Sequence, residues 1–115
     1  MPHLTDAVLI DRSNGVITIT INRPDQKNAV NGAVSYGVCA ALDELDMNPE
    51  LRVGILTGAG GTFCAGMDLK AFLRGEVTRV AHRGIMGLAL TPPKKPLIAA
   101  VEGYALAGGF EAVLA

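Results

Sequence analysis

Apolar residues follow two different periods along this chain, and the first half shows both. Residues 7–10 and 16–21 are short runs rich in apolar and β-branched residues, which favour β-strands. Between them lies Asn14-Gly15, a pair typical of tight β-hairpin turns. We therefore expect two antiparallel strands joined across Ser13-Asn14-Gly15.

A helical period follows the hairpin. Asn31 is a favourable N-cap residue, and the pattern predicts a helix from there to about Met47, with Pro49 preventing its continuation. Apolar residues recur every three or four positions, as on a helix that covers a sheet. These residues are Val34, Val38, Ala41, Leu42 and Leu45.

The second half repeats the alternation of strand and helix. A strand is predicted over 53–57, a helical stretch within 69–90, and a buried strand over 96–101 after Pro92-Pro93. Strands separated by helices favour parallel pairing through right-handed crossovers. The pattern thus predicts an α/β fold.

Two passages from strand to helix carry the candidate chemistry. Glycines at residues 58–66 and 103–109 allow close approach to backbone N–H groups that lack intrahelical partners. Such groups suit an oxyanion, and one carbonyl oxygen held by two of them forms an oxyanion hole. Glu111 falls one turn inside the second predicted helix, as an acid or base would. The pattern alone does not bring the two passages together.

Each of these features also has a purely structural interpretation. The glycines of 58–66 could form a tight loop, and they match neither a Walker loop nor a dinucleotide fingerprint. Glu111 could be a first-turn acid favoured by the helix dipole. Cys64 and His82 could form a thiol dyad, but with no third group to orient them a buried, inert Cys64 is the better interpretation.

Composition narrows the function class. Half of the residues are hydrophobic, yet no apolar run is long enough to span a bilayer. The N-terminal sequence lacks the basic and apolar blocks of a signal peptide, and two cysteines make neither a disulfide framework nor a zinc site. A net charge of −1 favours neither nucleic acid nor anionic membranes. We expect a cytoplasmic protein without nucleic-acid or membrane partners.

Three segments in order resemble the crotonase (enoyl-CoA hydratase/isomerase) superfamily. They are ITINRPDQKNAVN at 19–31, GTFCAGMDLK at 61–70 and KPLIAAVEGYALAGGFE at 95–111. The resemblance implies an α/β crotonase-like fold of repeated β-β-α units. Because the family's core is more than twice as long, residues 1–115 are expected to form the N-terminal part of one such domain, incomplete at its C-terminus. The family commonly forms trimers or hexamers.

The resemblance also implies a reaction. Backbone N–H groups of Met67 and Gly108 would form the oxyanion hole for an acyl-CoA thioester. Glu111 matches the first of two catalytic glutamates of the hydratases, and the second would lie beyond Ala115. The expected activity is hydration of the 2,3 double bond. The alternatives are an enoyl-CoA isomerase and an inactive or non-catalytic acyl-CoA-binding fragment.

Coenzyme A, expected here as part of the substrate, needs cations for its phosphates. Arg23, Lys27 and Lys70 lie near the motifs, and Lys94 and Lys95 are weaker candidates. Backbone groups of the 65–69 segment are expected to contact the adenine and the thioester. With Gly108, the residues of this predicted binding segment are Ala65, Gly66, Met67, Asp68 and Leu69. No metal and no separate cofactor is expected.

Overall fold

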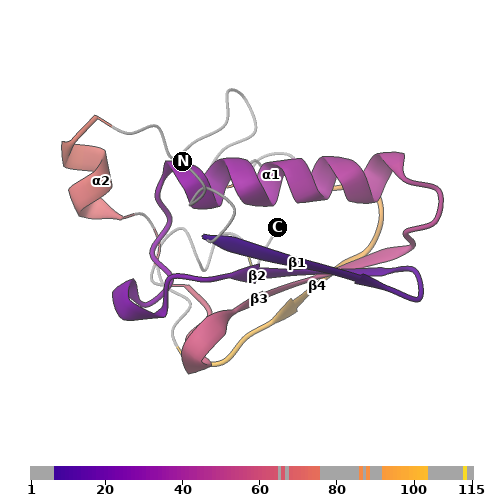
Figure 1. Cartoon of the computed structure of the whole chain (residues 1–115), viewed down its shortest axis with the longest axis horizontal. Coiled ribbons are helices and arrows are strands. Elements are labelled where there is room, and N and C mark those ends of the chain that lie inside the picture. Colours follow the sequence, from indigo (N-terminus) through magenta and orange to yellow (C-terminus); the bar gives the residue numbers. More distant parts are fainter. Residues whose placement is uncertain are drawn as a thin grey trace.

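The computed structural model describes residues 7–64, 66, 68–75, 86, 88, 92–103 and 113. Its sheet has the strand order β1-β2-β3-β4, and one long helix lies across one face of it (Figure 1). The strands are β1 (Val8–Ser13), β2 (Val16–Ile21), β3 (Val53–Gly58) and β4 (Leu97–Ala100). The α-helices are α1 (Gly32–Met47) and α2 (Leu69–Leu73), and two 3₁₀ turns are η2 (Pro24–Gln26) and η3 (Ala59–Gly61).

The predicted hairpin is confirmed, with a longer first strand than the pattern indicated. β1 and β2 are antiparallel, and their register places Ser13 opposite Val16. Asn14 and Gly15 alone make the turn, with φ of 54° and 81°. Positive φ at both central residues is the type I′ geometry, whose twist matches that of the strands. The apolar run therefore underestimated β1, because pairing continues through its polar end.

Helix α1 supplies the other half of the core, as predicted. The Asn31 side chain accepts a hydrogen bond from the Val34 N–H at 3.0 Å and thereby caps the first turn. The apolar face of α1 packs on Ile17, Ile19 and Ile21 of β2, which are fully buried. The five predicted core positions of the helix are all buried: Val34, Val38, Ala41, Leu42 and Leu45.

The crossovers produce the predicted parallel pairs. β2 pairs with β3, and β3 pairs with β4, both in parallel. The carboxyl ends of β3 and β4 therefore lie at the same edge of the sheet, where ligands commonly bind in α/β proteins. The prediction that residues 96–101 are buried is wrong, since the Ile98 side chain is 55% exposed. β4 is at one edge of the sheet, so one side of it has no neighbour among the strands that the structure describes.

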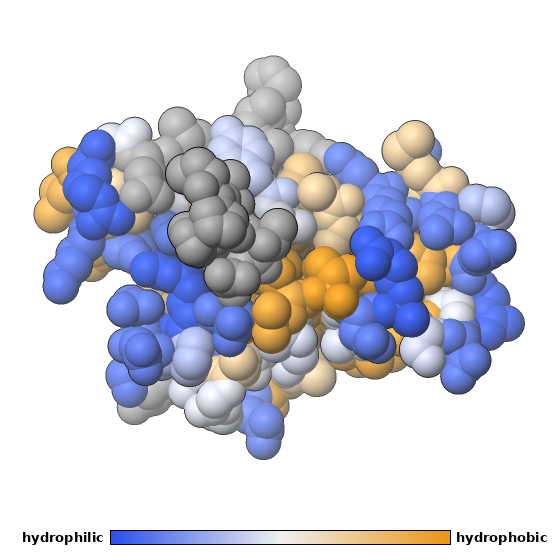
Figure 2. All heavy atoms as spheres, viewed as in Figure 1, coloured by the Kyte–Doolittle hydropathy of each residue, from blue (hydrophilic) through white to orange (hydrophobic). Residues whose placement is uncertain are grey.

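An apolar hollow of about 700 Å³ lies between β1 and the start of α1. Figure 2 shows hydrophobic atoms gathered at the centre of this face, between polar groups at either end. The hollow is lined by Val8, Leu9, Ile10, Gly32, Ala33, Tyr36 and Gly37. Among the described residues, neither helix is both long and apolar enough to cross a membrane.

Candidate active site

The loops that follow β3 and β4 are in direct contact. The Phe63 N–H donates to the Glu102 carbonyl oxygen at 2.6 Å. Gly103 has a φ of 64°, and a Cβ added there would lie 2.6 Å from the carbonyl oxygen of Gly61. Only glycine fits this close approach. The two strand-to-helix passages, which the sequence pattern could not bring together, therefore meet at their starts.

Asn28 ties the chain before α1 to the loop after β3. Its side-chain oxygen accepts from the Arg23 N–H at 2.8 Å, and its amide nitrogen donates to the carbonyls of Ala59 and Thr62 at 2.8 and 2.6 Å. The residue is fully buried and has a φ of 56°. Asparagine suits this place, because its side chain offers one acceptor and two donors and because the residue tolerates a positive φ.

The first predicted oxyanion segment is bonded to Val30. The Val30 N–H donates to the Gly66 carbonyl at 2.6 Å, and the Asp68 N–H donates to the Val30 carbonyl at 2.7 Å. Gly66 has a φ of 95°, which a side chain would strain. The two described neighbours of position 67 are therefore both anchored to one residue just before α1.

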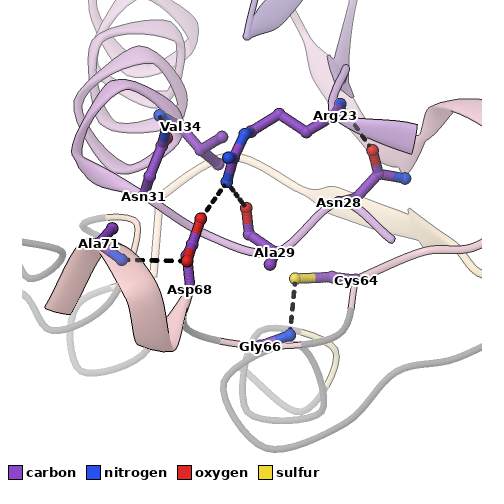
Figure 3. A network of polar contacts seen from close by, with 9 residues as sticks. All are labelled: Arg23, Asn28, Ala29, Asn31, Val34, Cys64, Gly66, Asp68 and Ala71. Atoms are coloured by element: carbon purple, nitrogen blue, oxygen red, sulfur yellow. Dashed lines mark hydrogen bonds and ion pairs between the residues drawn. The ribbon is translucent and has the colours of Figure 1, made fainter. Parts of the chain in front are cut away.

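Asp68 and Arg23 form an ion pair beside this junction (Figure 3). The Arg23 Nη1 lies 2.9 Å from Asp68 Oδ2 and 2.7 Å from the Ala29 carbonyl oxygen. Asp68 also caps α2, since its Oδ1 accepts from the Ala71 N–H at 3.1 Å. Burial alone would raise the pKa of the Asp68 carboxyl, but the hydrogen bonds from Ala71 and Arg23 lower it below its ordinary value.

A surface pocket of about 440 Å³ opens next to the ion pair. Lys70, a predicted coenzyme A ligand, lines it together with Arg23, and Arg74 adds a cation that the sequence interpretation missed. The other lining residues are Gln26, Ala29, Asp68 and Leu69. The predicted coenzyme A ligand Lys27 is not among the described residues that line this pocket. It follows Gln26 at the end of η2, with a φ of 51°.

The weaker cation candidate Lys95 lies elsewhere. Its Nζ donates to the carbonyls of Asn48 and Leu51, at 2.8 and 2.7 Å, and so closes the turn between α1 and β3. The Lys94 and Lys95 N–H groups both bond to the Asp46 carboxylate. Both lysines lie just before the first residue of β4, whereas the contact between the β3 and β4 loops lies after its last residue. The geometry thus assigns this pair a structural role.

Cys64 is fully buried, in agreement with the prediction of an inert thiol. Its Sγ accepts from the Gly66 N–H at 3.3 Å. Burial raises the pKa of the Cys64 thiol, and the hydrogen bond from Gly66 offsets only part of this effect. The thiol is therefore a poor nucleophile. His82, its conceivable dyad partner, lies outside the described residues.

Several predicted site residues lie outside the described part of the chain. They are Ala65, Met67, Gly108 and Glu111. Of the predicted residues that are described, Gly66 and Asp68 bond to Val30. Asp68, Leu69 and Lys70 line the 440 Å³ pocket. Among the described residues, no group of three or more His, Cys, Asp or Glu side chains could hold a metal ion.

The sequence matches a known family model. The model described as enoyl-CoA hydratase/isomerase matches residues 11–115, nearly the whole chain. The chain belongs to this family. Its three motif segments, 19–31, 61–70 and 95–111, all fall within the match. The resemblance to crotonases is thereby confirmed.

Two of the similar curated proteins are named as hydratases. The enoyl-CoA hydratase EchA19 of Mycobacterium tuberculosis is 42% identical over 113 residues, which cover 90% of this chain and 41% of that protein. The mevalonyl-coenzyme A hydratase sidH of Aspergillus fumigatus is 40% identical over 102 residues, 85% of this chain and 38% of that protein. The chain thus spans about 40% of the length of these curated relatives.

A solved structure confirms the crotonase-like fold. The crystal structure of enoyl-CoA hydratase EchA1 from Mycobacterium marinum superposes with a TM-score of 0.91 at 60% sequence identity. The superposition covers 95% of this chain and 43% of that one. The α/β arrangement of parallel strands with a covering helix therefore matches a part of that fold.

Proposed function

We propose that the protein containing this chain is an enoyl-CoA hydratase, which adds water across the 2,3 double bond of an acyl-CoA thioester. The contact between the loops after β3 and β4 is the observation that carries the proposal, because it joins the starts of both predicted oxyanion segments. The names of the two relatives support the same reaction class. The family assignment supports a coenzyme A thioester as the substrate.

In the proposed reaction the thioester oxygen binds between the N–H groups of Met67 and Gly108. Addition of water at the β-carbon pushes negative charge onto this oxygen as an enolate forms. Fixed donors stabilise that charge more than they stabilise the neutral thioester, so they lower the barrier. Loss of one such donor typically costs roughly 100- to 1,000-fold in rate.

Glu111 would orient the water and take its proton. A second carboxylate, outside these 115 residues, would transfer a proton to the α-carbon and complete the addition. General acid–base groups of this kind contribute roughly 100- to 10,000-fold each. Because both oxyanion donors are backbone groups, the Met67 side chain would shape the acyl entrance and need take no part in the chemistry.

Lys70 and Arg74 are the proposed cations for the phosphates of coenzyme A. Both line the 440 Å³ pocket that begins at the ion pair, and Lys27 follows the pocket residue Gln26 in sequence. The N–H groups of Gly66 and Asp68 already donate to Cys64 and Val30, so adenine contacts in the 65–69 segment would use other atoms. The absence of any separate cofactor, assembly into trimers or hexamers and a cytoplasmic location stay predictions.

The proposal is tested with the complete gene product and two substrates, a 2-enoyl-CoA and a 3-enoyl-CoA. We expect loss of the conjugated enoyl-thioester absorbance with crotonyl-CoA, and at least a 100-fold slower rate in Glu111→Gln. Conversion of the 3-enoyl-CoA to the 2-enoyl-CoA without hydration would identify an isomerase instead. Binding of the thioesters without turnover of either would identify a non-catalytic acyl-CoA-binding protein.

A further inference from the structure

We propose that Arg23 is a positioning residue for the first oxyanion segment: by holding Asp68 and Ala29 together, it fixes how Gly66 and Asp68 lie against Val30. The inference rests on the proposed function, in which this segment supplies one of the two donors to the thioester oxygen. It assigns to Arg23 a role other than the phosphate contact that its charge and its place near the motifs indicate.

The contacts of the guanidinium carry the proposal. A single nitrogen, Nη1, donates to the Asp68 carboxylate at 2.9 Å and to the Ala29 carbonyl at 2.7 Å (Figure 3). One partner, Ala29, directly precedes Val30. The other, Asp68, belongs to the segment that Val30 holds through its backbone hydrogen bonds with Gly66 and Asp68. The ion pair therefore closes the same junction that these two backbone bonds form.

The Arg23–Asp68 contact is better shielded from water than the Arg12–Glu44 ion pair. The Arg23 and Asp68 side chains are 17% and 11% exposed, whereas Arg12 in the Arg12–Glu44 pair is 51% exposed. Water and salt weaken exposed pairs, while partly buried charged hydrogen bonds are screened less and hold a more definite geometry. Asp68 is doubly constrained, because its other oxygen caps α2. The pair can therefore hold Asp68 and its segment in a fixed position relative to the loop that contains Arg23.

The competing role, a direct phosphate contact, has observations of its own, since Arg23 lines the cationic pocket. The two roles predict different kinetics. A phosphate ligand contributes to binding in ground state and transition state alike, so its loss raises KM and leaves kcat unchanged. A positioning residue changes the alignment of the donor with the developing charge, so its loss lowers kcat.

The test compares four variants of the complete gene product with crotonyl-CoA. They are Arg23→Gln, Asp68→Asn, the double variant and, as a control, Arg12→Gln, which removes an ion-paired arginine from β1. Asparagine at position 68 keeps an acceptor for the Ala71 N–H, so the cap of α2 is preserved. We expect kcat to fall roughly 10- to 100-fold in each single variant, with KM little changed. The double variant should be no slower than the singles, because they break the same contact.

Amide hydrogen exchange supplies a readout that does not depend on turnover. In Arg23→Gln, exchange at Val30 and Asp68 should accelerate roughly tenfold or more, while Phe63, bonded to Glu102, keeps its rate. Unchanged exchange at Val30 and Asp68 would overturn the proposal. So would a raised KM with unchanged kcat in Arg23→Gln while Asp68→Asn behaves as wild type, which would identify a phosphate ligand. If the wild-type protein hydrates no enoyl-CoA, the proposed function fails, and the exchange rates alone decide whether Arg23 holds the segment.

Discussion

The backbone N–H of Phe63 donates to the carbonyl oxygen of Glu102 at 2.6 Å, and this bond joins the loops that leave two neighbouring parallel strands. The close approach of Gly103 to Gly61 reinforces the same contact. Both loops continue into segments that the family resemblance assigns to the oxyanion hole. Any change that separates the loops should therefore affect stability and the proposed activity together.

Gly103→Ala tests this contact. The new Cβ would lie 2.6 Å from the Gly61 oxygen at a φ of 64°, so we expect destabilisation by about 2–4 kcal/mol and loss of hydratase activity. Gly75→Ala is the matched control, because φ is 84° there but no described atom lies within 4 Å of the added Cβ. Only strain of about 1–2 kcal/mol should result, with activity retained. Equal effects of the two substitutions on unfolding and activity would contradict the contact.

Asn28→Asp should destabilise the protein although the two side chains have nearly the same shape. The carboxylate loses the donors to Ala59 and Thr62 and places negative charge against their carbonyl oxygens in a buried site. We expect a loss of about 2–4 kcal/mol in the free energy of unfolding, measured in urea.

Asn31→Asp is the control for this charge change. Its side chain only needs to accept from the Val34 N–H at the start of α1, where a negative charge is favourable. The substitution should be neutral or slightly stabilising. If Asn28→Asp were equally harmless, the hydrogen bonds of Asn28 to the loop after β3 would not contribute to stability.

The Arg23–Asp68 pair should make stability depend on acid pH. Since the pKa of Asp68 is lowered in the folded state, its carboxylate stabilises the protein above the unfolded-state pKa. This contribution is lost as the pH falls through the folded-state pKa. The stability difference between wild type and Asp68→Asn should therefore be largest at neutral pH and shrink in acid. Glu44→Gln, which breaks the exposed pair with Arg12, should show a smaller change, and a pH-independent difference for Asp68→Asn would contradict the assignment.

Cys39 and Cys64 should resist thiol reagents in the folded protein. Both are buried, and the raised pKa of Cys64 leaves little thiolate at neutral pH. We expect no modification of Cys39 or Cys64 by a disulfide reagent within minutes in buffer, and labelling of both after unfolding in guanidinium. Rapid labelling of Cys64 in the native state would revive the interpretation of a reactive thiol.

Local signals in the sequence predicted the main elements well. Asn31 with its helical apolar spacing predicted α1, and Asn14-Gly15 predicted the hairpin, because capping and turn chemistry act over a few residues. The exposure of Ile98 was not predictable in this way. A run of apolar residues indicates a strand, but burial depends on what covers the strand.

The site was predicted in part. The motifs predicted that Gly66, Asp68 and Lys70 belong to one segment, and the structure places this segment against Val30 and the cationic pocket. The partner of Asp68 could not be predicted, because Arg23 lies 45 residues away in the sequence. Side-chain pairs of this kind are set by tertiary structure, for which one sequence carries no local pattern.

The most direct test of the central claim is the ¹³C NMR shift of the thioester carbonyl in labelled crotonyl-CoA bound to the Glu111→Gln variant of the complete gene product. That variant is expected to turn the substrate over slowly, so that the bound substrate can be observed. If the segments after β3 and β4 donate two hydrogen bonds to this oxygen, the carbonyl resonance moves downfield from its position in free crotonyl-CoA, and Gly103→Ala added to the same variant reduces the shift. A bound carbonyl that resonates where the free one does would contradict the oxyanion hole and the hydratase assignment with it.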